Sequence, residues 1–198
     1  MASNPELSLT VDFFKDLVPM FSNQIPSIKD LKNQLILETT AQMSSQLGRC
    51  YVFGYSNPKG YEKGGRLKYH HIFPASIMIG EEGGDMIGIN PYYIPPRVRV
   101  KVIDFFLNNL TTNRNIDAND RTVVIYQKIK NTALGEAMKP AIKRYIKSRI
   151  SSRVVRLSPR LLIDMYLGQT SSKMNKLFRG ASVSEVYKDY RVKFLRNY

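Results

Sequence analysis

Eight Lys and Arg side chains gather between residues 139 and 160, and this stretch contains no Asp or Glu. On a helix, Lys139, Lys143 and Lys147 would recur at every fourth position and so align on one face. Cations aligned in this way are suited to follow the phosphates of DNA, so we predict DNA binding here, with a solvated basic face as the alternative. The basic row consists of Lys139, Lys143, Arg144, Lys147, Arg149, Arg153, Arg156 and Arg160.

The adjacent histidines His70 and His71 are the second set of residues that could carry chemistry. They resemble the His-rich strand of HNH-type nucleases, which bind a divalent metal and activate water on a phosphodiester. Neighbours on a strand point to opposite faces, so at most one of them would face a given pocket. Asn90 could orient a histidine, but no third histidine and no Asp/Glu cluster at ligand spacing follows. We therefore expect no catalytic residue, no metal site and no cofactor, and keep a metal nuclease as the second alternative function.

The charge of the chain is large and unevenly placed. Lys and Arg number 30 against 16 acidic residues, which gives a net charge of +14. Residues 1–47 contain three Lys and five acids, so the remainder carries sixteen net positive charges. Such a field favours a polyanion as partner, either nucleic acid, an anionic membrane surface or an acidic protein. No apolar run approaches the ~20 residues that span a bilayer, and we expect no membrane partner. The single cysteine excludes an internal disulfide framework.

Residues 1–47 are expected to form a helical arm. Apolar residues recur near helical spacing from Leu7 onward, and Pro26 separates this segment from a second helix that Ser27 can cap. An amphipathic arm must bury its apolar stripe, on its own body or on a neighbouring subunit. We favour the neighbour, and the predicted assembly interface contains Phe14, Leu17 and Phe21.

Residues 48–198 are expected to form the second part of a single α+β fold. Aromatic and β-branched residues predict strands at 49–55, 72–79 and 86–90, with Gly83-Gly84 as a turn. Several short strands with Gly-rich turns indicate a small curved β-sheet or an SH3-like partial barrel. The N-terminal helical arm and a basic helical C-terminal region would flank it.

The expected C-terminal region is mostly helical. Pro95-Pro96 opens a first helix, and a further helix runs from about Glu136 to Ile150 with the basic row on it. Val154-Val155 predicts a short strand, and Ser182 with Glu185 forms a capping box for the last helix. Three further cations would support the row, and they are Lys173, Lys176 and Arg179.

Four motifs in the chain resemble a family of small basic proteins from large T-even-like contractile-tailed bacteriophages. The motifs are Gly48-x-x-Tyr51-x-Phe53-x-Tyr55-x-x-Pro58-Lys59, Tyr69-x-x-x-Phe73-Pro74, Gly88-Ile89-Asn90-x-x-Tyr93-Ile94-Pro95-Pro96-x-x-Arg99 and Lys139-Pro140-x-x-Lys143-Arg144-Tyr145-x-x-Ser148. The resemblance covers residues 48–156, with a weaker echo at Val186-Tyr187-x-Asp189. Before Phe-Pro the family pattern often carries Tyr-Asp, which suggests that the histidines here are not a shared catalytic feature.

The resemblance implies a non-enzymatic virion or DNA-packaging protein, of the kind called DNA end protectors or head-completion factors. Its expected partners are DNA without sequence preference, other virion proteins and further copies of the chain. Its expected location is the virion, and the host cytoplasm during assembly. The leading alternative is a structural tail or baseplate component whose charge matches an acidic neighbour.

Overall fold

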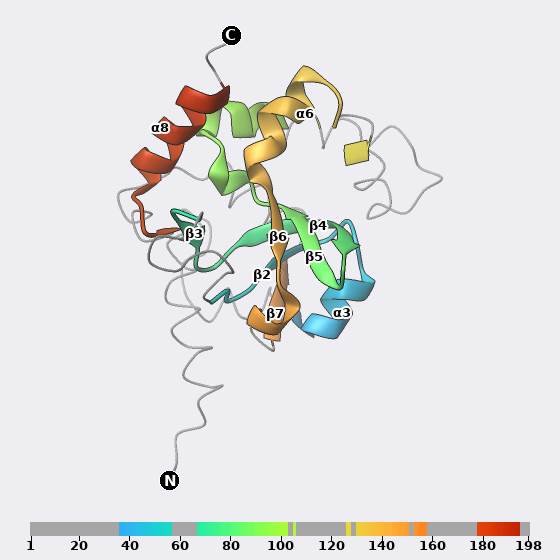
Figure 1. The fold of residues 1–198 in the computed structure, drawn as a ribbon. Coiled ribbons are helices and arrows are strands. Elements are labelled where there is room, and N and C mark those ends of the chain that lie inside the picture. The colour runs from blue at the N-terminus through green and yellow to red at the C-terminus, as the bar shows by residue number, and fades with distance from the viewer. Residues whose placement is uncertain are drawn as a thin grey trace, which may run out of the picture.

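The computed structural model describes residues 36–56, 67–102, 105, 126–127, 130–150, 153–157 and 178–194. Their centre is an antiparallel six-stranded sheet with the order β1-β7-β2-β4-β5-β6 (Figure 1). The order is linear and leaves β1 and β6 at the two edges, so the sheet does not close into a barrel. The predicted mixture of helix with a small sheet is confirmed, whereas the SH3-like form is not. The strands are β1 (Ile36–Thr39), β2 (Cys50–Val52), β4 (Ala75–Glu82), β5 (Asp85–Ile89), β6 (Ile142–Tyr145) and β7 (Arg153–Leu157).

The hairpin of β4 and β5 forms where the sequence predicts a Gly-rich turn. Gly83 and Gly84 have φ of +57° and +82°, a region that favours glycine and gives the two-residue turn that matches strand twist. Alternate side chains of β4 enter different cores, because successive side chains of a strand point to opposite faces. The buried hydrophobic side chains form two clusters, a larger core and a smaller core. Ile77 and Ile79 belong to the larger core, and Met78 belongs to the smaller core.

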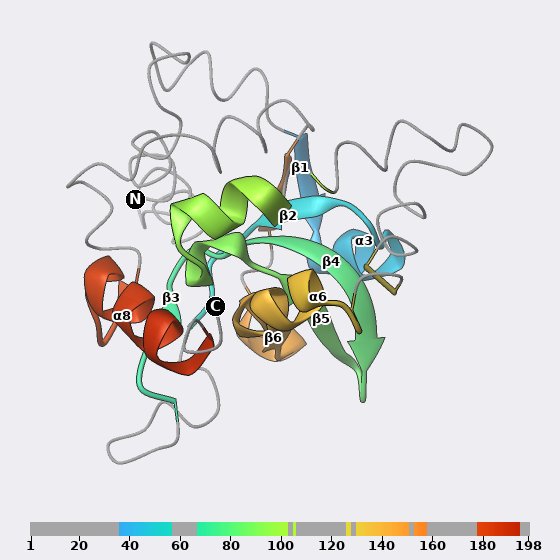
Figure 2. The same ribbon diagram turned by 90° about the horizontal axis from the view of Figure 1, so that it is seen from above.

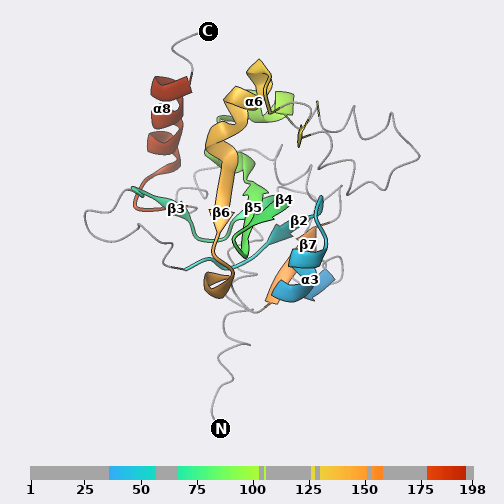
Figure 3. The same ribbon diagram turned by 45° about the vertical axis from the view of Figure 1, so that its right-hand side comes forward.

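Three helical segments lie together above the strands in Figures 1 and 3, at the end of the molecule opposite α3 (Thr40–Ser45). They are residues 96–102, α6 (Ala133–Met138) and α8 (Val183–Phe194), and Figure 2 shows them from above. We call these three segments the helical cap. None of the described helices has the length and apolar character that crossing a bilayer requires.

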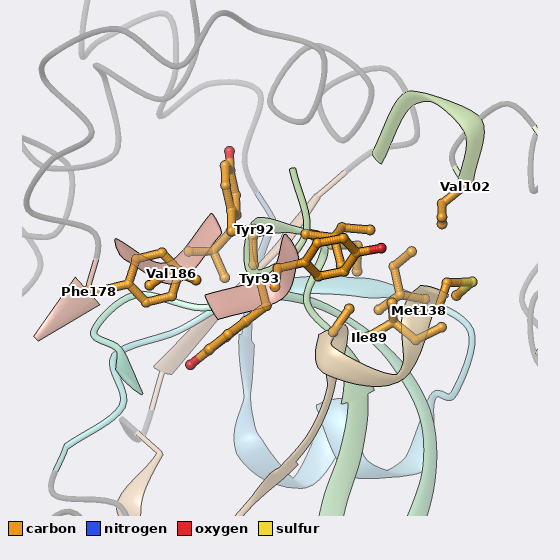
Figure 4. Close-up of a cluster of buried hydrophobic side chains, with 14 of the residues drawn as sticks. Ile89, Tyr92, Tyr93, Val102, Met138, Phe178 and Val186 are labelled. Atoms are coloured by element: carbon orange, nitrogen blue, oxygen red, sulfur yellow. The ribbon is translucent and has the colours of Figure 1, made fainter. Parts of the chain in front are cut away.

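The larger core joins the helical cap to the sheet. It holds Ile89 of β5, Tyr92 and Tyr93 of the 3-10 helix η2 (Pro91–Tyr93), and side chains from all three cap segments (Figure 4). Phe178 enters from the two-residue strand β8 (Phe178–Arg179), which pairs with β3 (His70–His71). The helical cap is therefore packed on the sheet by aromatic and aliphatic contacts.

Local signals at two helix starts are confirmed. Pro95 directly precedes the helix and Pro96 is the first helical residue of 96–102, consistent with the tolerance of proline in a first turn. Ser182 caps α8: its hydroxyl accepts from the Glu185 amide at 3.3 Å, and its amide donates to the Glu185 carboxylate at 2.7 Å. This is the predicted capping box.

The predicted helix from Glu136 to Ile150 is wrong. α6 ends at Met138 and is followed by η3 (Lys139–Ala141), β6 and η4 (Lys147–Arg149). Pro140 cannot continue an α-helix because its ring clashes with the preceding turn and it has no amide to donate. Ile142 and Tyr145 then pair with Ile89 and Met86 of β5. The basic row therefore does not lie along one helical face.

The predicted helix over 27–47 is wrong where β1 forms. Ile36 to Thr39 pair with β7, and within residues 36–47 the helix is confined to Thr40–Ser45, with Thr39 and Gln42 forming its capping box. The division into a 1–47 arm and a 48–198 module stays a prediction. Residues 1–35, with Phe14, Leu17 and Phe21, lie outside the described residues, as do Arg160, Lys173 and Lys176.

Candidate nucleic-acid interface

Two cations of the basic row are held by acids at the tip of the β4–β5 hairpin. Arg144 Nε lies 2.9 Å from Asp85 Oδ2, and Arg144 Nη1 lies 3.9 Å from Glu82 Oε2. Lys147 Nζ pairs with Glu81. Three carboxylates thus face two cations, so this cluster, the hairpin tip, carries one net negative charge. The acids lie about sixty residues earlier in the chain, which is why the row looks uncompensated in the sequence.

Arg156 of the row binds a buried carboxylate. Its Nη1 lies 2.9 Å from Oε1 of Glu38, whose side chain is only 6% exposed. The Tyr51 hydroxyl donates to Glu38 at 2.8 Å, and Arg49 lies 3.8 Å away. Burial, followed by this contact with Glu38, raises the pKa of Tyr51. The group ties β1, β2 and β7 together, so Arg156 has a structural role.

The remaining members of the row are scattered. Lys139 is exposed and pairs with Glu136 at 2.7 Å. Lys143 places its ammonium 3.7 Å from the centre of the Tyr93 ring, a cation–π contact. Arg149 is half-buried in η4, and the backbone of Arg153 pairs with Thr39. The described members of the row therefore make different contacts, and whether the row contacts DNA stays a prediction.

The two histidines belong to a buried polar and aromatic group. His70 and His71 are 4% and 2% exposed. Nδ1 of His71 lies 3.0 Å from the side-chain amide nitrogen of Asn90, and its ring packs against Tyr92 and Phe178. Burial, with contributions from His70 and Arg99, lowers the pKa of His71 to about 3, so this histidine is neutral near pH 7. Asn90 does orient a histidine, as the nuclease hypothesis requires.

No metal centre accompanies this histidine among the described residues. Groups of three or more His, Cys, Asp or Glu that could hold an ion do not occur there. His71 is also closed off by the aromatic rings that pack against it. The arrangement gives the nuclease hypothesis no support within the described part of the chain.

The residues that carry the family resemblance lie mainly in the core. Asn90 is fully buried: its side-chain oxygen accepts from the Tyr92 amide at 3.2 Å, and its backbone amide donates to the Ala141 carbonyl at 2.7 Å. Arg99 is 1% exposed and places its guanidinium 4.7 Å from the centre of the Tyr92 ring. It also donates to the Tyr187 hydroxyl. These residues stabilise the fold. The residue type alone does not show that Arg99 is buried and not a surface cation.

Four exposed cations on the helical cap were missed by the sequence analysis. Arg97 and Lys101 flank the buried Arg99 at two positions on either side, which places them on the opposite face of that helix. Lys188 and Arg191 are three apart on α8, which buries Val186 and Tyr190. In the described part of the chain, none of these four forms an ion pair within 4.0 Å, although hydrogen bonds from Ser182, together with the nearby charge of Lys188, lower the pKa of Glu185. Helical periodicity could have indicated these exposed cations, but the prediction followed the higher density of Lys and Arg in the basic row.

These features define a basic α+β protein in which part of the charge is paired and part faces outward. The chain belongs to the family of the phage T4 terminal DNA protecting protein, whose family model matches residues 28–190. The resemblance to T-even-like phage proteins is thereby confirmed. A search of curated proteins and a search of solved structures each find no match. The family match gives no support to a tail or baseplate role.

Proposed function

We propose that this protein is a non-enzymatic phage protein that binds the termini of DNA and shields them from degradation. The observation that carries the proposal is the family match over residues 28–190. The net charge of +14 supports it, because a field of this sign attracts a polyanion and steers its approach. Protection needs only occupancy of the terminus, so it requires no catalytic group.

Contact with DNA would be made through phosphates and without sequence preference. Lys139 and Arg144 keep 56% and 50% of their side chains exposed, so members of the basic row remain candidates for this contact. Exposed ion pairs are worth roughly 0–1 kcal/mol, so a phosphate can displace a carboxylate partner at low cost. The protein would act in the virion and in the infected host, together with other virion proteins.

An exonuclease assay tests the proposal. Linear duplex DNA is incubated with the full-length protein and then digested with a double-strand exonuclease. We expect protection of the linear DNA, and binding that weakens with salt at a log–log slope of about −0.9 per phosphate contacted. An unrelated protein of the same net charge controls for simple coating of the duplex. If that control protects equally well, or if the protein leaves the DNA fully digested at low salt, the proposal is wrong.

A further inference from the structure

The three segments of the helical cap are fixed to one another by buried contacts. Arg99, from residues 96–102, donates to the Tyr187 hydroxyl of α8. The Tyr190 hydroxyl of α8 donates to the carbonyl of Ala137 in α6 at 3.1 Å. Val102, Met138 and Val186, one from each segment, share the larger core shown in Figure 4. The helix backbones that carry the exposed cations therefore have a fixed relative position.

The buried and exposed sides of these helices differ sharply in character. Residues 96–102 bury Arg99 and Val102 and expose Arg97 and Lys101. α8 buries Val183, Val186, Tyr187 and Tyr190, whereas Lys188 and Arg191 of the same helix are exposed. We call these four exposed side chains the cap cations. None of them contributes to the core, so the fold does not require their charge.

Local charge distinguishes the helical cap from the hairpin tip. The three segments of the helical cap contain six cations and three acids, which leaves three net positive charges. The cations are Arg97, Arg99, Lys101, Lys188, Arg191 and Lys193, and the acids are Glu136, Glu185 and Asp189. Glu185 is already engaged with Ser182 as a helix cap, and Asp189 accepts a hydrogen bond from Tyr69. The hairpin tip carries one net negative charge instead. A phosphate backbone is attracted to the first surface and repelled by the second.

We propose that the cap cations Arg97, Lys101, Lys188 and Arg191 form the main phosphate-binding surface of this protein for duplex DNA. This assignment rests on the proposed function. It makes the cap cations, and not the basic row, the principal contact with DNA. Helices 96–102 and α8 present the surface, and the buried contact between Arg99 and Tyr187 sets their relative position. Each cation neutralises one phosphate, and no base edge needs to be read.

Two variants with the same reduction in charge test the assignment. The cap variant carries Arg97→Gln, Lys101→Gln, Lys188→Gln and Arg191→Gln. The row variant carries Lys139→Gln, Arg144→Gln, Lys147→Gln and Arg149→Gln. Binding of each full-length variant to a labelled 30-base-pair duplex is measured across a salt series, and circular dichroism checks that both remain folded. Each variant has four fewer positive charges. A difference in DNA affinity between the two variants therefore reflects where the charges were removed and not the change in net charge.

We expect the cap variant to bind at least tenfold more weakly than the parent at fixed salt. Its salt slope should be shallower by about 0.9 for each phosphate that is no longer neutralised, while the row variant should change much less. An equal or larger weakening in the row variant would overturn the assignment and leave DNA binding intact. Unchanged binding in both variants would also overturn it. A parent protein that neither binds nor protects DNA would instead refute the proposed function.

Discussion

At the scale of single residues, the buried polar side chains explain why particular residue types occur in the family-like motifs. Asn90 reaches five partners. Its backbone contacts Tyr93 and Ala141, and its side chain contacts His71, Tyr92 and Tyr145. A side chain without both a donor and an acceptor cannot satisfy them. Asn90 is recognisable in the sequence as a motif residue, but its role depends on His71 and Tyr145, which only the folded chain brings near.

The buried His71 makes stability depend on pH. Its pKa falls from an ordinary value of 6.5 to about 3 on folding, so below pH 6.5 the unfolded chain binds a proton that the folded protein excludes. Stability should therefore fall as the pH drops from 6.5 towards 3, by about 1.4 kcal/mol per pH unit from this group. Burial also lowers the pKa of His70, which acts in the same direction.

The variant His71→Asn tests this pH dependence, because an amide oxygen can still accept from Asn90 but does not titrate. Urea denaturation at several pH values should show a smaller pH dependence in the variant. The parent should lose its advantage over the variant progressively between pH 6 and pH 4. Identical slopes in the two proteins would show that His71 is not the titrating group.

Gly88 illustrates a second residue-scale constraint, a close approach between strands. A Cβ atom added there would lie 2.3 Å from the Ser76 hydroxyl and 3.2 Å from the Ile77 carbonyl. Gly88→Ala should destabilise the protein by about 1–3 kcal/mol, the usual range for an overpacked core. Gly80→Ala is the matched control, since an added Cβ meets no atom within 4 Å there. Equal unfolding midpoints for the two variants in chemical denaturation would contradict the prediction.

At the scale of elements, the sequence predicted the turns, strands and helix caps that are determined by residues close together in the chain. The Gly83-Gly84 turn, the short strand at 154–155 and the Ser182 cap all depend on residues near one another in the chain, and all three are confirmed. β6 and β1 were missed because their partners are β5 and β7, more than fifty residues away in sequence. Long-range pairing overrides the weak helical preference of such short segments.

The capping box of α8 gives the element-scale prediction. Ser182→Ala removes the hydroxyl that accepts from the Glu185 amide, and should cost about 1 kcal/mol of stability. Ser184→Ala is the control, because Ser184 is exposed in the first turn of the same helix and alanine favours helix there. Thermal unfolding should show a lower midpoint only for the first variant. A decrease of similar size in both would assign the effect to something other than the cap.

At the scale of the whole molecule, the total charge could be read from the sequence but its pairing could not. The basic row contains no acid among its own residues, yet carboxylates from the β4–β5 hairpin, α6 and β1 reach Arg144, Lys147, Lys139 and Arg156. Charge pairing is a property of three-dimensional neighbours. Composition therefore predicted the class of partner. The fold was needed to distinguish the cations that are paired with carboxylates from those that are exposed to solvent.

The N-terminal arm carries the prediction for the assembled state. Phe14, Leu17 and Phe21 are predicted to bind a neighbouring subunit, since an amphipathic stripe must be buried. Light scattering should show a mass above that of one chain, and replacing the three residues by serine should reduce it to the monomer. A protease-resistant monomer with the arm intact would show that the arm packs on its own body.

The single cysteine provides a reporter that is already built into the middle of the sheet. Cys50 is 4% exposed in β2, where it stands opposite Ile77 of β4 and Leu157 of β7. A thiol reagent can reach it only when those strands separate, because neighbours cover it on both sides. Since the chain has one cysteine, every labelled molecule records one opening event at one place. The rate of labelling thus measures how often the centre of the sheet opens, with or without DNA bound and without any engineered probe.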